Sequence, residues 1–203
     1  SNFKNLKKAY SAGKELSKKT LGIIGFGRIG QEVAKKAIGL GMNVIANDKF
    51  ISEANITLNF YNGEKKTFTI ETSSLEEVLK NSDFISLHIP KVEDKAVIGA
   101  EEIGLMKTGA GIINTSRGGL IDEDALMFAL DKGKLSYAGL DVFEHEPQIT
   151  QKLFESNNVI LLPHISSATF ESRIAMGNRV IKNVKSFVNG KVPPDLVDKQ
   201  YDE

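Results

Sequence analysis

Thr20–Gly30 reads TLGIIGFGRIG, and this stretch decides the fold of the chain. Its first half is a short apolar run, typical of a strand buried on both faces, and the QEVAKKAIGL that follows it has helical periodicity. Between them Gly25, Gly27 and Gly30 form a G-x-G-x-x-G turn: one glycine allows a tight bend, one lets the backbone approach a diphosphate, and one lets the helix pack closely. The free N–H groups of the helix N-terminus favour the negative charge of that diphosphate. The stretch therefore predicts a dinucleotide site.

The residues after this helix predict which dinucleotide binds. A second strand is expected over Met42–Ala46, and Asp48 stands at its end, 18 residues beyond Gly30. A carboxylate at this place can accept hydrogen bonds from both adenosine ribose hydroxyls, and it repels a 2′-phosphate. We therefore expect NAD as the cofactor rather than NADP.

The composition excludes several other classes of protein. The 203 residues carry no formal net charge, which gives no electrostatic reason to expect nucleic acid or a membrane surface as a partner. No apolar run approaches the roughly 18 residues of a membrane-spanning helix, and no secretory signal opens the chain. With no cysteine and three histidines, we expect neither a disulfide nor a metal site. A cytoplasmic location is expected.

Apolar runs and helical patterns alternate along the rest of the chain. The expected strands are Asp83–His88, Gly111–Asn114, Tyr137–Asp141 and Val159–Leu162. The expected helices are LEEVLKNS after Ser73 and Ser74, a short one near Glu101–Met106, EDALMFALDKG after Asp122, and Phe170–Val188. This alternation predicts an α/β fold of the Rossmann type, a doubly wound parallel sheet with helices on both faces. Ligands of such sheets bind beyond the carboxyl ends of the strands.

One segment breaks the alternation. Between Ile56 and Ile70, apolar residues alternate with threonine and asparagine on both sides of Asn62-Gly63. This pattern predicts a β-hairpin, because both turn positions tolerate positive φ. We interpret the hairpin, residues 56–70, as a surface excursion without chemistry.

The chain is expected to have three parts. Residues 1–19 are lysine-rich and are predicted to be an interdomain linker, although Lys4, Lys7 or Lys8 could instead help to hold an anionic substrate. Residues 20–165 form the predicted dinucleotide-binding domain. Residues 166–203 are expected to be a C-terminal helix and a polar tail.

Three motifs follow predicted strands. NTSRGG places Arg117 where a guanidinium can clamp a carboxylate with two hydrogen bonds, and LPHISSA places His164 directly after a strand. The motif GLDVFEHEP carries Asp141, Glu144, His145 and Glu146. An arginine, a histidine and a carboxylate that meet at one sheet edge indicate an active site more strongly together than separately.

GIIGFGRIG, SLHIP, INTSRGGLIDEDAL, GLDVFEHEP and PHISSAT have the order and spacing found in the D-2-hydroxyacid dehydrogenases, which this chain resembles over almost its whole length. The resemblance implies that Arg117 binds the carboxylate and keto oxygens of the substrate and that His164 is the catalytic histidine. It implies that Glu146, rather than Glu144 or His145, is the partner of His164. Other positions that the resemblance implies at the cofactor are Arg28, Ile29, His88, Pro90, Thr115 and Asp141, the last at the nicotinamide carboxamide.

These roles agree with the chemistry of 2-keto acid reduction. Hydride that reaches the carbonyl carbon leaves negative charge on the oxygen, so an acid must supply a proton. His164 can act as this acid near neutral pH, and Glu146 would orient its ring and stabilise the imidazolium. Arg117 would hold the carboxylate and polarise the carbonyl.

The substrate is less well defined by the sequence. The opening FKNLKKAYSAGKELSKKTLGIIGFGRIGQEVAK looks most like that of short 3-phosphoglycerate dehydrogenases of serine biosynthesis, which we expect first. LPHISSATFESR is similar to hydroxypyruvate and glyoxylate reductases, the first alternative. An alternative of another class is an NAD(H)-sensing binding protein with the same site.

The resemblance also bears on the organisation of the chain. Family members carry an N-terminal substrate domain that nothing in residues 1–20 resembles, and the C-terminal helix would return to it. We therefore expect a chain that binds NAD and turns over poorly by itself. A homodimer formed through the NAD-binding domain is also implied.

Overall fold

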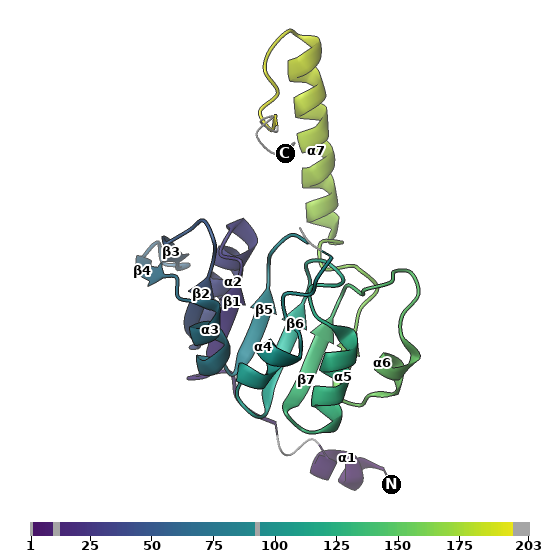
Figure 1. Cartoon of the computed structure of the whole chain (residues 1–203). Helices are drawn as coiled ribbons and strands as arrows, with labels where there is room; N and C mark the ends of the chain where they lie inside the picture. Colours follow the sequence, from purple (N-terminus) through teal and green to yellow (C-terminus); the bar gives the residue numbers. More distant parts are fainter. Residues whose placement is uncertain (1, 10–12, 92–93, 197–203) are drawn as a thin grey trace. The chain divides into compact units, whose positions relative to one another are not determined.

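The computed structural model describes residues 2–9, 13–91 and 94–196, and the chain divides into two compact units, residues 1–164 and 165–203. The first unit is built on a six-stranded parallel sheet with the strand order β2-β1-β5-β6-β7-β8 (Figure 1). Its strands are β1 Thr20–Ile24, β2 Asn43–Asn47, β5 Phe84–Leu87, β6 Ala110–Asn114, β7 Leu135–Leu140 and β8 Val159–Leu161. The central strands are almost wholly buried, as their apolar runs predict.

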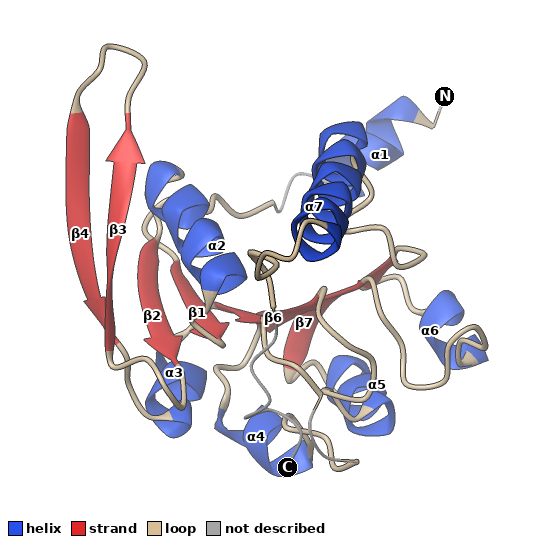
Figure 2. Cartoon of the chain, turned by 90° about the horizontal axis from the view of Figure 1, so that it is seen from above, coloured by secondary structure: helices blue, strands red, loops and turns tan. Residues whose placement is uncertain are grey.

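Helices cover both faces of this sheet, as Figure 2 shows. α2 (Arg28–Gly39) lies on one face, and the other face carries α3 (Leu75–Asn81), α4 (Ala100–Leu105) and α5 (Glu123–Asp131). The predicted caps are present: Ser74 forms a capping box with Glu77, and the carboxylate of Asp122 accepts a hydrogen bond from the Ala125 N–H at 2.8 Å. The predicted fold, a Rossmann-type doubly wound α/β sheet, is confirmed.

The predicted hairpin is also present. β3 (Glu53–Asn59) and β4 (Lys65–Glu71) pair antiparallel, with Thr57 opposite Thr67 and Gly63 in the turn at φ +86°. One face of the hairpin is polar, and on the other Ile56 is buried with residues of α2. After β4 the chain makes one parallel bridge, from Thr72 to Ala46 of β2. The hairpin thus fills the place beside β2 that a further strand of the sheet would take.

Two short helices are found where none was predicted. The segment predicted as a linker contains α1 (Phe3–Ala9), and α6 (Gln151–Glu155) lies between β7 and β8. Lysine, leucine and alanine are good helix formers, which accounts for α1, while a helix of five residues is too short to show a period. The remaining differences are shifts of one to three residues at the ends of strands and helices, as in β2 and β3.

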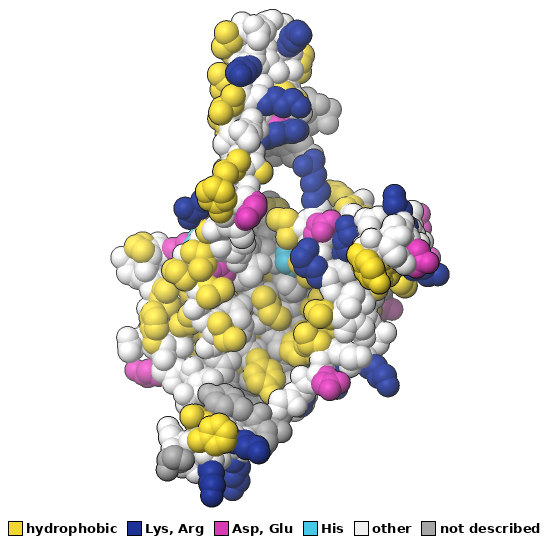
Figure 3. Space-filling model, turned by 180° about the vertical axis from the view of Figure 1, so that it is seen from behind, with side chains coloured by type: hydrophobic (Ala, Val, Ile, Leu, Met, Phe, Trp, Pro, Cys, Tyr) yellow, Lys and Arg dark blue, Asp and Glu magenta, His cyan; other side chains and the backbone are white. Residues whose placement is uncertain are grey.

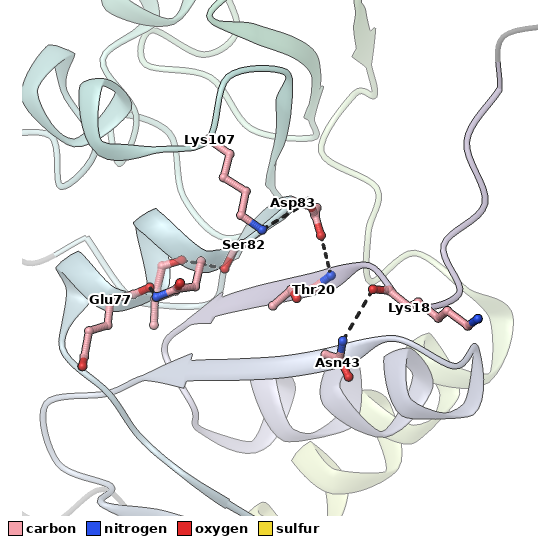
Figure 4. A network of polar contacts seen from close by, with 9 residues as sticks. Lys18, Thr20, Asn43, Glu77, Ser82, Asp83 and Lys107 are labelled. Atoms are coloured by element: carbon pink, nitrogen blue, oxygen red, sulfur yellow. Dashed lines mark hydrogen bonds and ion pairs between the residues drawn. The ribbon is translucent and has the colours of Figure 1, made fainter.

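A polar network joins the amino ends of the strands (Figure 4). The carboxylate of Asp83 accepts hydrogen bonds from the Thr20 N–H at 2.8 Å and from the Lys107 ammonium at 3.3 Å. The Ser82 hydroxyl, which is fully buried, donates to the Val78 carbonyl at 2.6 Å. Together these hydrogen bonds fix the start of β1, the residue before β5 and the end of α3 relative to one another.

The face of the sheet opposite α3–α5 gathers hydrophobic side chains (Figure 3). Tyr137 of β7 is 47% exposed and Ile160 of β8 is 69% exposed, while the alternate residues Ala138 and Leu140 are buried in the core. Alternation along a strand sends neighbours to opposite faces, so the two exposed residues lie away from the core side.

The second unit contains one long helix, α7 (Phe170–Val188), with the bounds that the sequence predicts. The Thr169 hydroxyl caps its start, and Gly190 follows its end at φ +67°. The carboxylate of Asp195 accepts hydrogen bonds from Arg179 and Asn183, which folds the following segment back along α7. No helix in the described part of the chain is long and apolar enough to cross a bilayer.

Candidate active site

The three glycines of the β1–α2 turn have the different roles that the motif predicts. Gly25 has φ +94°, and a Cβ there would lie 2.5 Å from the carbonyl oxygen of His88. A Cβ at Gly30 would lie 2.1 Å from the Gly25 carbonyl oxygen, so only glycine allows α2 this close to the turn. A Cβ at Gly27 would meet nothing within 4 Å. Gly27 is also the N-cap residue of α2, so no side chain caps this end of the helix. Its open side therefore leaves room for a diphosphate at the helix N-terminus.

Asp48 follows β2 and faces this turn. One carboxylate oxygen accepts a hydrogen bond from the Phe26 N–H at 2.6 Å, and the other accepts from the N–H groups of Phe50 and Ile51 at 2.8 and 3.1 Å. Asp48 therefore ties the glycine turn to the loop after β2, a structural role that the sequence did not predict. Each carboxylate oxygen has two acceptor sites, and three of the four are used by described residues, so one site on Oδ2 remains for a ribose hydroxyl.

A cavity of about 520 Å³ opens beside Asp48. Its lining includes Gly25, Asp48 and Lys49, together with the apolar residues Val97 and Leu120. An apolar cavity with a carboxylate at its rim suits an adenosine, whose base is largely apolar and whose ribose donates hydrogen bonds. The residues present fit NAD.

The predicted cofactor residues lie at the carboxyl ends of the strands. Pro90 lines the cavity, Arg28 and Ile29 are exposed in the first turn of α2, and Thr115 directly follows β6. The His88 Nε2 hydrogen bonds to the Ser86 hydroxyl at 2.9 Å, and burial lowers the pKa of His88. His88 is therefore favoured as a neutral imidazole beside the glycine turn.

Backbone hydrogen bonds bring three strand ends into register. The Asp141 N–H donates to the Asn114 carbonyl at 2.9 Å, and the His164 N–H donates to the Asp141 carbonyl at 2.9 Å. Asp141 is 1% exposed, so its backbone is fixed among β6, β7 and the segment after β8. His164 itself has φ +53°, a left-handed conformation that is strained for a residue with a Cβ.

Glu146 and His164 form the pair that the resemblance implies. The His164 Nδ1 lies 2.8 Å from Glu146 Oε2, and the Phe143 N–H donates to Glu146 Oε1 at 2.9 Å. The bond from His164, with the one from Phe143 in support, holds the pKa of Glu146 below its ordinary value. Because an ionised carboxylate only accepts, the imidazole must donate from Nδ1, which leaves Nε2 for a substrate. A pocket of about 190 Å³ adjoins both side chains.

Arg117 lies in the turn after β6, next to the loop that carries Glu146. A Cβ at Gly118 would lie 1.7 Å from the Phe143 carbonyl oxygen, so the two backbones are in direct contact. The side-chain amide of Asn114 donates a hydrogen bond to the Arg117 carbonyl at 2.9 Å and so stabilises this turn. Among the described residues, the guanidinium hydrogen bonds to its own neighbour, the Ser116 carbonyl, and to neither Glu146 nor His164. It is exposed at the edge of the site, where it can turn toward a substrate.

Two residues near these motifs escaped the sequence reasoning. The Lys91 ammonium lies over the same turn, 2.7 Å from where a Cβ of Gly119 would be. Glu123, in the first turn of α5, is buried, whereas acidic residues at helix starts are usually exposed. No local pattern signals either feature, because both depend on contacts between distant segments. The part of the chain that the structure describes holds no cluster of three metal-ligating side chains.

Comparison with known proteins identifies relatives of this arrangement. Residues 2–166 match the family model described as "D-isomer specific 2-hydroxyacid dehydrogenase, NAD binding domain". The chain is 45% identical over 193 residues to a glyoxylate reductase of Thermococcus litoralis, which covers 92% of this chain and 54% of that protein. It is 44% identical over 176 residues to a hydroxypyruvate reductase of Thermotoga maritima, which covers 85% of this chain and 54% of that protein.

A solved structure of a D-2-hydroxyacid dehydrogenase is also similar to this chain. D-lactate dehydrogenase of Lactobacillus jensenii, solved with NAD+, superimposes with a TM-score of 0.78 at 28% identity, over 97% of this chain and 62% of that one. The chain spans about half the length of the curated relatives it matches.

Proposed function

The chain belongs to the D-isomer-specific 2-hydroxyacid dehydrogenase family as its NAD-binding domain, and from this we propose that it carries the cofactor site and the proton donor of a 2-keto acid reductase. The observation that carries the proposal is the Glu146–His164 pair, 2.8 Å apart at the carboxyl end of the sheet. We propose glyoxylate or hydroxypyruvate as the substrate. The curated relatives support this alternative better than 3-phosphoglycerate, which the opening segment favoured.

The cofactor supplies the hydride when it is bound, and the chain's own residues do the rest. The open side of Gly27 and the N-terminus of α2 accept the diphosphate, and Asp48 accepts a hydrogen bond from a ribose hydroxyl. Arg117 binds the carboxylate of the keto acid, which fixes the carbonyl carbon for attack. His164 donates a proton from Nε2 to the carbonyl oxygen as negative charge develops there. Glu146 holds the ring through Nδ1 and stabilises the imidazolium form.

The proposal predicts an order of substrate preference. The complete gene product should oxidise NADH with glyoxylate and hydroxypyruvate, and much more slowly with 3-phosphohydroxypyruvate. The measurement is the decay of NADH absorbance at matched concentrations of the three acids. A preference for the phosphorylated acid would reverse the substrate assignment while leaving the reaction type intact.

The alternative of an NAD(H)-sensing binding protein makes a different prediction. Calorimetry with the purified chain should give micromolar NADH binding in either case. If the complete gene product binds NADH and turns over none of the three acids, the catalytic proposal is wrong and NAD(H)-dependent partner association becomes the function to test.

The family resemblance supports a proposal about assembly, and the composition supports one about location. We propose a homodimer formed through the NAD-binding domain, which light scattering on the purified protein tests directly. A cytoplasmic location is likewise kept as a prediction, to be tested by fractionation of the source cells.

A further inference from the structure

We propose that Glu123 is a positioning residue: its carboxyl group fastens both ends of the loop that carries Glu146 and thereby sets the ring of His164. The consequence for catalysis rests on the proposed reductase function. The positioning itself can be measured without any substrate.

The first argument is the burial of Glu123. It is 8% exposed, whereas the side chain of Asp124, the next residue of α5, is 91% exposed. Among the described residues, no lysine, arginine or histidine forms an ion pair with Glu123. Placing a carboxyl group in such a site is costly unless hydrogen bonds compensate. The helix start does not need it, because Asp122 already caps α5.

The second argument is where those hydrogen bonds go. Oε1 of Glu123 accepts from the Glu144 N–H at 2.7 Å, and Oε2 accepts from the Thr150 hydroxyl at 3.3 Å. Glu144 and Thr150 stand at the two ends of a short loop, and Glu146 lies between them. One side chain of α5 therefore closes a loop that lies more than 20 residues further along the chain.

The third argument is the short path from this fastening to the catalytic pair. The N–H group of Phe143, next to Glu144, donates to one oxygen of Glu146, and the other oxygen accepts from His164 Nδ1. The same backbone supports the Arg117 turn, since the Phe143 carbonyl leaves no space for a Cβ at Gly118. A displacement of residues 143–144 would therefore reach both sides of the site.

The test is the protonation state of the histidine ring nitrogens, measured by nitrogen-detected NMR on the purified chain. The chain has three histidines, which makes assignment practical. Spectra are recorded at a pH well above the ordinary histidine pKa of about 6.5, so that the rings are neutral. The exposed His145 gives the reference for a free ring, and His88, held by Ser86, reports whether the fold is intact.

Three variants separate positioning from folding. In Glu123→Ala, the Nδ1 signal of His164 should move from the protonated position toward that of His145, while His88 and NADH binding stay unchanged. Glu123→Gln keeps one acceptor for the Glu144 N–H, so it should restore most of the wild-type signal. Asp124→Ala, the matched control on the same helix, should leave His164 unchanged.

An unchanged His164 signal in Glu123→Ala with an intact His88 signal would overturn the proposal. If Glu123→Ala does not fold, Thr150→Val decides, because it removes one of the two fastenings and keeps the side-chain volume. A partial shift of His164 in Thr150→Val supports the proposal, and an unchanged His164 signal in Thr150→Val overturns it. Substrate turnover enters none of these outcomes, so a wrong substrate assignment would leave them unaffected.

Discussion

All strands of the parallel sheet begin on one side, here called the amino edge, and end on the other, here called the carboxyl edge. The two sides use similar polar residues in opposite ways. At the amino edge, Asp83 accepts hydrogen bonds from the Thr20 N–H and from Lys107, and these groups are used up within the fold (Figure 4). At the carboxyl edge, Glu146 holds His164 on one side only, and the imidazole remains 54% exposed in a strained backbone conformation.

This difference separates stability from function within one domain. When all partners of a polar group lie in the fold, removing that group lowers the free energy of unfolding. A polar group held at one atom and open at another is available to a ligand, and strain at such a residue is typical of functional sites. Substitutions at the two edges should therefore change different measured quantities.

The largest effect is expected at the carboxyl edge, where His164 is open to a ligand. His164→Ala should lower kcat of the complete gene product with glyoxylate about 10²- to 10⁴-fold, because the proton donor is lost. The Kd for NADH, measured by calorimetry, should stay the same. His145→Ala is the control, since this histidine is exposed and outside the pair. Equal losses in kcat and NADH affinity would remove His164 from its catalytic role.

The next effect concerns the cofactor. Asp48→Ala should weaken NADH binding about 10- to 100-fold, the equivalent of losing charge-assisted hydrogen bonds of about 1.5 to 3 kcal/mol. Asp48→Asn keeps the shape and one acceptor oxygen while it removes the charge, so it should bind NADPH better than the wild type does. Unchanged affinity for NADPH in Asp48→Asn would argue against charge repulsion as the source of the preference.

A smaller effect is expected at the amino edge, where the polar groups are paired within the fold. Asp83→Ala leaves the Thr20 N–H without its side-chain acceptor and should lower the free energy of unfolding by about 1 to 2 kcal/mol, measured by urea denaturation. Lys107→Ala, which removes only a partly exposed ion pair, should cost less than about 1 kcal/mol. NADH binding should be unchanged in both variants, and a loss there would break the separation of the two edges.

The smallest effect is a dependence on pH. The folded-state pKa of Glu146 lies below its ordinary value, so its hydrogen bond to His164 stabilises the fold above that ordinary value and is lost as the pH falls through the folded-state pKa. The difference in unfolding free energy between wild type and Glu146→Gln should therefore shrink on acidification. We expect it to stay below about 1 kcal/mol, because solvent screens a partly exposed pair. Glu144→Gln, which removes a carboxylate from the same loop without touching the bond to His164, is the matched control.

Much of the fold could be predicted from local patterns. The glycine turn, the hairpin around Asn62-Gly63 and both ends of α7 follow from periodicity and turn chemistry, which act over a few residues. The Glu146–His164 pair came from motif resemblance, and the structure places the two side chains in contact. Short elements were missed, as α6 shows, because five residues do not complete two helical turns.

The roles of Asp48 and Glu123 within the fold could not be predicted. Asp48 ties the glycine turn to its own loop, and Glu123 reaches a backbone N–H 21 residues away. Both contacts depend on how distant segments pack, which a single sequence does not encode in any local period. Motifs in the sequence thus predict candidate ligand-facing residues, whereas they do not predict the contacts by which Asp48 and Glu123 hold the surrounding loops.

The hairpin of β3 and β4 also limits how this sheet can grow. Thr72 forms a parallel bridge with Ala46, and the Ser73 N–H donates to the Ala46 carbonyl at 2.7 Å, so part of the outer side of β2 is already paired. The opposite edge strand, β8, has three residues, too few to template a long added strand. The two outer strands of the parallel sheet therefore offer little backbone for pairing with another chain.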